Sequence, residues 1–256
     1  LDFFSWYILI MSDLPFISIL TPIFNRTKWL PLMLYNLENL DYPKDKLEWV
    51  ILDTHDNNCI AWDKLFKNKK QIQDAQSKIG FKINYQMNDN SYMIGEKRNK
   101  LVKQATHKIC ANMDSDDAML PSWLKHSIEV MRTDKKCGLV GTPEMTFVFP
   151  LIDFKITAIS CKDIRMMHEA GMVFTKKHHR SMGGFGKASS NEGTGMIDHN
   201  ENKCLRTDAD KVIICVCHND NTISKDRFSD KSNENVRLGG KIKDVIEAII
   251  FTKIEI

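Results

Sequence analysis

The chain has 256 residues, of which 43% are hydrophobic and 27% charged, an ordinary composition for a globular protein with a full core. Its 36 basic and 33 acidic residues leave a net charge of +3, which argues against a nucleic-acid partner. The seven cysteines follow no disulfide or zinc spacing, and the only close pair is Cys215 and Cys217. We therefore expect reduced thiols and a cytoplasmic location, with no evident membrane association.

Residues 1–14 are expected to be an N-terminal extension or remnant. The apolar run from Phe3 to Met11 lacks a basic leader and is shorter than the roughly 20 residues of a membrane helix. Met11 would be a sensible initiator, and a truncated membrane anchor is the alternative. The rest is expected to be one domain with two halves, 15–135 and 136–256.

The first half alternates between apolar strands and amphipathic helices. We expect strands at 16–21, 47–53, 81–85 and 108–113, and helices at 26–37, 64–79, 95–105 and 122–132. This alternation predicts an α/β fold whose mostly parallel central sheet has helices on both faces. Such sheets bind ligands beyond the carboxyl ends of their strands, where Asp53 and the acidic residues after 113 fall.

Three acidic residues, Asp114, Asp116 and Asp117, follow the fourth strand. Side chains two apart on an extended backbone point the same way, so Asp114 and Asp116 can face one cation. Hard oxygen ligands favour Mg²⁺ or Mn²⁺. The same residues could equally cap the helix that follows, but their position at a strand end favours a metal-diphosphate site.

The second half is less regular. We expect strands at 138–142, 147–149, 156–159, 171–175 and 212–217, with a helical stretch near His178. Residues 181–194 are glycine-rich and form either an active-site loop or a plain connection. The tail at 241–251 is amphipathic and is expected to pack on the domain.

No phosphate-binding Gly-x-x-x-x-Gly-Lys, no Gly-x-Gly-x-x-Gly and no Gly-x-Ser-x-Gly occurs. Four other segments occur in order: Thr-Pro-Ile-Phe-Asn-Arg at 21–26, Tyr-Pro-Lys-Asp at 42–45 with the strand to Asp53, Ile-Gly-Glu-Lys-Arg-Asn at 94–99, and Met-Asp-Ser-Asp-Asp at 113–117 with Pro121. Together they resemble the GT-A glycosyltransferases of family 2, over residues 15–135. The resemblance implies a GT-A fold and a metal-dependent glycosyltransferase.

The resemblance also implies roles for individual residues. Thr21, Pro22 and Asn25 would line the nucleotide pocket, and Asp53 would accept a hydrogen bond from the base, commonly uracil. Arg98 would lie near the nucleotide and fix the acidic loop. Asp114 and Asp116 match the Asp-x-Asp motif, one facing the ribose and the other the metal.

The sequence departs from the family pattern after Asp53, where Thr54-His55-Asp56 replaces the frequent Asp-Gly-Ser. The family resemblance implies a catalytic base after the Gly-Gly-Phe at 183–185, and Glu192 is our candidate, with Asp198 as the alternative. His218 follows the last strand and is either a metal- or phosphate-contacting residue or a structural histidine.

The resulting hypothesis is inverting transfer of a sugar from a nucleotide-diphosphate donor, favoured as a UDP-sugar, with Mn²⁺ or Mg²⁺. The acceptor would be the hydroxyl of a glycan, a glycoprotein or a small molecule. Two alternatives remain: a degenerate GT-A protein that binds a nucleotide or glycan without turnover, and a nucleotidyltransferase.

Overall fold

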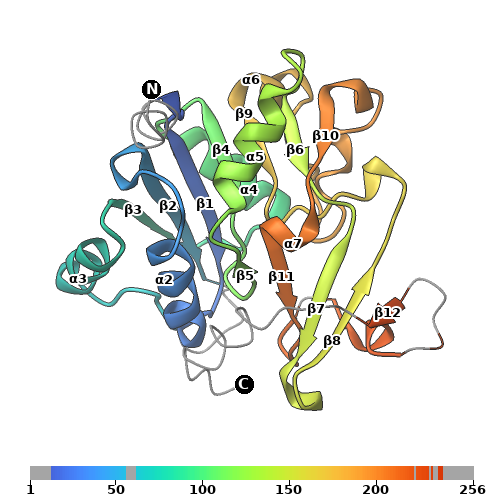
Figure 1. Ribbon diagram of the computed structural model, residues 1–256. Coiled ribbons are helices and arrows are strands. Elements are labelled where there is room, and N and C mark those ends of the chain that lie inside the picture. Colours follow the sequence, from blue (N-terminus) through green and yellow to red (C-terminus); the bar gives the residue numbers. More distant parts are fainter. Residues whose placement is uncertain (1–12, 56–61, 222, 231, 233–235, 239–256) are drawn as a thin grey trace, which may run out of the picture.

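Figure 1 shows the computed structural model, which describes residues 13–55, 62–221, 223–230, 232 and 236–238. The tail helix expected at 241–251 and residues 1–12 lie outside these ranges. The confirmed architecture is a mixed α/β fold around a large sheet whose central strands are parallel.

The large sheet has seven strands in the order β10-β6-β9-β4-β1-β2-β3. Their bounds are β1 (Ile17–Ile23), β2 (Leu47–Thr54), β3 (Lys82–Asn88), β4 (Ile109–Asn112), β6 (Leu139–Gly141), β9 (Val173–Thr175) and β10 (Cys204–Arg206). Neighbours from β4 to β3 run parallel, whereas β9 is antiparallel to both β4 and β6. The carboxyl ends of β1, β2 and β4 therefore meet at one edge.

Helices cover both faces of this sheet, as the alternation of β1 and β2 requires. Ile19 and Trp49 face one core cluster, together with α2 (Leu30–Glu38), α3 (Lys69–Ile79) and α5 (Trp123–Arg132). Leu20 and Val50 face the other cluster, against α4 (Ile94–Gln104). In Figure 1, α2 and α5 lie in front of the sheet and α4 behind it.

A second sheet of five strands stands beside the large one (Figure 1), in the order β12-β8-β7-β11-β5. Its strands are β5 (Ala118–Met119), β7 (Met145–Phe149), β8 (Lys155–Ile159), β11 (Ile213–Val216) and β12 (Val236–Leu238). Two helices are short: α6 (Lys176–Ser181) directly follows β9, and α7 (Ala209–Val212) directly precedes β11. One-turn helices lie at Thr27–Trp29, Lys44–Lys46, Pro150–Ile152, Ile164–Met166, Thr194–Met196, Glu201–Lys203 and Asp226–Phe228.

Two of the element boundaries that differ from the sequence predictions have a clear physical cause. The first strand continues through Pro22 to Ile23 rather than ending at Pro22. Its pairing with β4 stops at Leu20, so Pro22 lies beyond that ladder and its missing N–H is tolerated there. Helix α3 begins at Lys69 rather than at 64, because the Asn68 side chain accepts the Gln71 N–H and caps it.

Among the described residues, we find no helix that combines the length and the apolar character needed to cross a membrane.

Candidate active site

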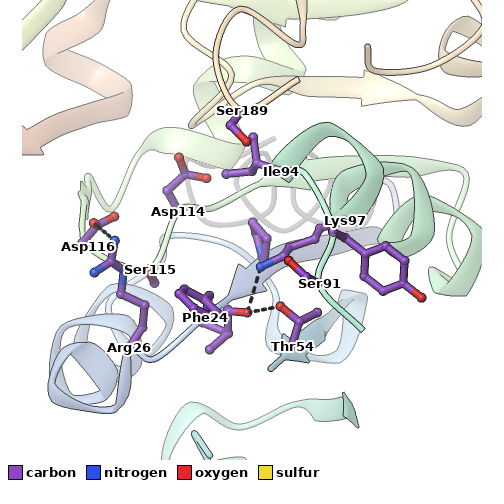
Figure 2. A pocket seen from close by; sticks show the side chains of 13 residues that line it. Phe24, Arg26, Thr54, Ser91, Ile94, Lys97, Asp114, Ser115, Asp116 and Ser189 are labelled. Atoms are coloured by element: carbon purple, nitrogen blue, oxygen red, sulfur yellow. Dashed lines mark hydrogen bonds and ion pairs between the residues drawn. The ribbon is translucent and has the colours of Figure 1, made fainter. Parts of the chain in front are cut away.

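A cavity of about 250 Å³ opens at the edge where β1, β2 and β4 end. Figure 2 shows Arg26 and Asp116 on one side of it, and Lys97, Thr54 and Ser91 on the other. We call it the donor cavity. Of the residues expected to line a nucleotide pocket, Pro22 and Asp114 do so.

Two other residues of that prediction, Thr21 and Asn25, do not line the donor cavity. Thr21 is buried and its hydroxyl accepts the Trp49 Nε1–H at 2.8 Å. Asn25 adopts a left-handed backbone conformation with φ of 49°, which asparagine tolerates, and turns the chain after β1. Their roles toward a nucleotide remain predictions.

Asp53 is the penultimate residue of β2 and is fully buried, and its carboxylate already accepts three internal hydrogen bonds. The donors are Trp62 Nε1 at 3.2 Å, Leu65 N at 2.9 Å and the Tyr85 hydroxyl at 2.5 Å. Burial and this bond to Asp53 raise the pKa of Tyr85 above its usual range. Asp53 therefore joins β2, β3 and the segment before α3, beneath the cavity rather than in its wall.

Lys97 in α4 reaches the donor cavity, although the sequence did not single it out. Its side chain is packed against the Phe24 ring, 5.2 Å from the ring centre, and Nζ lies 3.4 Å from the Ile23 carbonyl oxygen. Burial lowers the pKa of Lys97 to about 8, while the nearby Asp53 carboxylate opposes this shift. The Lys97 ammonium is buried beside the carboxyl end of β1, which makes it a candidate ligand-binding group.

Arg98, the next residue, joins two carboxylates from distant segments. Its Nη2 lies 2.9 Å from Asp114 Oδ1, and its Nε donates to Glu192 Oε1 at 2.9 Å. The guanidinium is 1% exposed. Burial opposes its charge, but Asp114 and Glu192 outweigh burial and raise the pKa of Arg98. Burial raises the pKa of Asp114, and Arg98 limits that rise. The expectation that Arg98 fixes the acidic loop agrees with these contacts.

Asp116 faces the donor cavity beside a histidine and an arginine. His218 Nε2 lies 3.1 Å from Asp116 Oδ2, and Arg26 Nη2 lies 3.8 Å from the same oxygen. Burial opposes ionisation of Asp116, but the His218 hydrogen bond and the Arg26 charge lower its pKa overall. Arg26 belongs to the motif at 21–26 and was assigned no role from the sequence.

His218 is held from its other side by the Asp220 backbone N–H, which donates to Nδ1 at 3.1 Å. An imidazole that accepts at Nδ1 in its neutral form carries its proton on Nε2, which lies 3.1 Å from Asp116 Oδ2 and 2.9 Å from Asn221 Nδ2. In this tautomer His218 orients Asp116, and the ring also packs on Trp29 with 4.3 Å between ring centres. Binding a metal through Nε2 would require the other tautomer.

Asp117 has a structural position. Its carboxylate accepts the Val216 N–H at 3.2 Å, and its backbone carbonyl accepts from Asn36 at 2.9 Å. Burial raises the pKa of Asp117 well above its usual range. These bonds connect the acidic loop to β11 and α2, rather than capping α5.

A second cavity, of about 530 Å³, adjoins the first; both are lined by Ile94, Asp114, Asp116 and Ser189. We call it the acceptor cavity. Its walls include Glu169, Glu192 and His168, with Met145 and Ile159 from the small sheet. Burial lowers the pKa of His168 to about 4, so this imidazole is neutral at pH 7.

Glu169 is the second carboxylate beside Glu192, and the sequence analysis missed it because no motif marks it. Its Oε1 accepts the Gly193 N–H at 3.0 Å. Burial, and then the charge of Glu192, raise the pKa of Glu169. Asp198, the alternative base, lines neither cavity described here.

The glycine-rich segment 181–194 is folded onto α4 and brings Glu192 to Arg98. Asn99 forms two hydrogen bonds with Phe185, donating to its carbonyl at 2.8 Å and accepting its N–H at 2.9 Å. A Cβ on Gly95 would lie 1.8 Å from the Gly186 carbonyl oxygen, so only glycine allows this approach. The motif at 94–99 thus forms the surface of α4 on which the glycine-rich segment packs.

For a divalent metal, the residues present fit a partial site. Asp116 presents carboxylate oxygens in the wall of the donor cavity, with Asp114 nearby and His218 behind it. Within the described part of the chain, no three His, Cys, Asp or Glu side chains are grouped to hold an ion by themselves. A metal here would need further ligands, such as the oxygens of a diphosphate.

Comparison with solved structures defines the class of fold. Staphylococcus aureus TarS 1–349 in complex with UDP-GlcNAc has a TM-score of 0.59 at 18% identity, over 80% of this chain and 60% of that chain. The mannosyltransferase PcManGT from Pyrobaculum calidifontis, in complex with GDP-Man and Mn²⁺, has a TM-score of 0.56 at 16% identity, over 83% of this chain and 63% of that chain. The fold is that of the GT-A glycosyltransferases, and the chain spans about three fifths of these relatives.

At the level of sequence, residues 18–188 match the family described as Glycosyl transferase family 2, so the chain belongs to that family. The resemblance of the four motifs is thereby confirmed. No curated protein matches the chain.

Proposed function

We propose that this protein transfers a sugar from a nucleotide-diphosphate donor, favoured as a UDP-sugar, to an acceptor hydroxyl, with inversion. The acceptor would be a glycan, a glycoprotein or a small hydroxylated molecule. The observation that carries the proposal is the meeting of two cavities at Asp114 and Asp116. A donor and an acceptor held on either side of these carboxylates would be adjacent.

In this proposal the nucleotide occupies the donor cavity, with Asp114 toward the ribose and Asp116 toward the diphosphate. Mn²⁺ or Mg²⁺ held there by Asp116, with Asp114 and His218 nearby, would offset the charge on the departing diphosphate. Arg98 keeps Asp114 in place. Arg26, which lines the same cavity, adds a fixed positive charge beside Asp116.

Glu192 is the proposed base. Arg98 holds its Oε1, which leaves Oε2 to receive a proton in the acceptor cavity. The acceptor oxygen would form a bond to the anomeric carbon while that carbon's bond to the diphosphate oxygen breaks. The bonding electrons would leave with the diphosphate, and the acceptor proton would pass to Glu192.

A test is release of UDP from a panel of UDP-sugars with Mn²⁺ and candidate acceptors. We expect Asp116→Asn to lower turnover by about 100-fold or more, since it removes a charged group from the leaving-group side. Asp208→Asn is the control, because that side chain is 71% exposed and lines neither cavity. Equal turnover in Asp116→Asn and the wild type would contradict the site assignment.

A nucleotide-binding protein without turnover is the second candidate. The observation in its favour is that, among the described residues, no three His, Cys, Asp or Glu side chains are grouped to hold the ion that would aid departure of the diphosphate. Nucleotide binding with no UDP release from any donor, with or without acceptor, would support this candidate over the enzyme.

A further inference from the structure

Lys97 places an ammonium group in the wall of the donor cavity. The residue is 8% exposed, and the long contact of 3.4 Å to the Ile23 carbonyl is the only hydrogen bond of its Nζ to a described residue. An ammonium has three N–H donors, so two of them are left for a ligand. Figure 2 shows Nζ directed into the cavity between Phe24 and Ser91.

The surroundings of Lys97 suit a flat, polar ring. Phe24 and Tyr92 supply aromatic surface in the cavity wall, and 37% of Phe24 is exposed. Thr54 and Ser91 add hydroxyl groups. Asp53 does not line the cavity, because its carboxylate is occupied by three internal hydrogen bonds. Lys97 is therefore the charged side chain at the end of the cavity that Thr54 and Ser91 line.

We propose that Lys97 reads the nucleobase of the donor by donating a hydrogen bond to a ring carbonyl, and thereby selects uracil or guanine. The inference rests on the proposed function and deepens it. Uracil carries O4 where cytosine carries an amino group, and guanine carries O6 where adenine carries one. Lysine has no acceptor, so an amino group at that point would face N–H donors and leave both sides unpaired.

With Lys97 reading the base, Asp53 has a structural role instead of the base-binding role that the family resemblance implies. Asp53 holds Trp62, Leu65 and Tyr85 together and, as a nearby negative charge, favours the protonated form of Lys97. Burial nevertheless lowers the pKa of Lys97 to about 8, which leaves the group mostly protonated at pH 7. The other charged neighbour is Arg26, which disfavours protonation.

The experiment is calorimetric titration of UDP, CDP, GDP and ADP in the presence of Mn²⁺ at pH 7. We expect the wild type to bind UDP over CDP, or GDP over ADP, by about 10- to 100-fold, the effect of one unpaired buried donor. Which of the two carbonyl bases binds more tightly identifies the donor. Lys97→Met should remove the preference by weakening only the carbonyl base, and Lys97→Arg should retain part of it.

Lys103→Met is the matched control, since Lys103 is exposed in the last turn of α4 and lines neither cavity. Thermal melting should show Lys97→Met to be folded, because the change removes a buried charge. An unchanged base preference in Lys97→Met would overturn this inference alone. Failure of the wild type to bind any of the four nucleotides would instead overturn the proposed function.

Discussion

At the scale of single residues, the guanidinium of Arg98 decides where two carboxylates stand. It draws Asp114 from the loop after β4 and Glu192 from the glycine-rich segment to one buried point. A buried arginine between two carboxylates is tolerated because each charge is paired and hydrogen-bonded. Both oxygens of Asp114 lie within 3.2 Å of Arg98 Nη2, whereas Glu192 contacts Arg98 through Oε1, so its Oε2 is the oxygen proposed to take the acceptor proton.

Conservative variants distinguish the roles of the three candidate carboxylates, Glu192, Glu169 and Asp198. We expect Glu192→Gln to lower kcat for transfer by about 10²- to 10⁴-fold, the usual contribution of a general base, with little change in UDP affinity. Glu169→Gln should cost less, because the amide oxygen can still accept the Gly193 N–H. Asp198→Asn should leave kcat unchanged, since this residue lines neither cavity.

Initial rates and UDP titrations on the three variants make the comparison, and Glu169→Ala is the additional variant. If Glu169 positions the loop, the alanine variant should raise the acceptor KM as well as lower kcat. A large loss in Asp198→Asn, with Glu192→Gln active, would reverse the assignment of the base.

At the scale of elements, helix α4 links the two cavities. One face of its first turns lines the donor cavity through Lys97, and the same turns seat the glycine-rich loop through Gly95 and Asn99. Because Arg98 lies between these positions, a shift of the loop moves Glu192 relative to Asp114. The motif at 94–99 is therefore a packing motif as much as a ligand-binding one.

Gly95→Ala tests this packing. The added methyl group would meet the backbone carbonyl of Gly186, which has no flexible end to move aside. We expect the loop to be displaced, with faster tryptic cleavage at the exposed Lys187 and a fall in transfer of about tenfold or more, because small displacements of catalytic groups are costly. Gly195→Ala is the control, since nothing lies within 4 Å of its Cβ position. Unchanged cleavage and transfer in Gly95→Ala would show that the loop is not seated in this way.

Local patterns predicted the elements of the first half well, because each strand there is a long apolar run followed by an amphipathic helix. The strand at 47–53 and the helix at 95–105 appear within a residue or two of their expected positions. The second half was harder, since its strands of three to five residues are divided between the large sheet and the small one. No local signal assigns such strands to one sheet or another.

The candidate site likewise contains residues that sequence motifs mark and residues that only the tertiary structure reveals. Asp114, Asp116 and Arg98 belong to motifs that the sequence displays; the structure pairs Asp114 with Arg98 and places Asp114 and Asp116 in the wall of one cavity. Lys97 and Glu169 were missed because their importance comes from burial in a cavity wall, which depends on distant segments. The sequence singled out Asp53 at the end of a strand, but the three hydrogen bonds that occupy its carboxylate come from tertiary contacts that the sequence does not display.

At the scale of the whole molecule, the donor cavity belongs largely to the first half of the chain and the acceptor cavity largely to the second. The halves meet where Asp116, after β4, contacts His218, after β11. The two residues thus join the large sheet to the small one, and they do so at the proposed metal position. Any ion bound there would have ligands from both halves or from one half and the nucleotide.

This arrangement predicts that Mn²⁺ and UDP bind cooperatively. Because the described residues group no complete set of protein ligands, Mn²⁺ alone should bind weakly, and the diphosphate should supply the missing oxygens. By linkage, each should raise the affinity of the other by the same factor, which we expect to be about tenfold or more. Calorimetric titration of Mn²⁺ with and without UDP, and of UDP with and without Mn²⁺, measures both factors.

Asp116→Asn should abolish this coupling while leaving metal-free UDP binding close to that of the wild type, since the base and ribose contacts remain. Lys97→Met should do the opposite, weakening UDP in both conditions and keeping the coupling factor. Tight binding of Mn²⁺ in the absence of nucleotide would contradict the prediction, because it would require a complete protein-made site. The two variants together separate recognition of the base from recognition of the diphosphate, although their side chains line the same cavity.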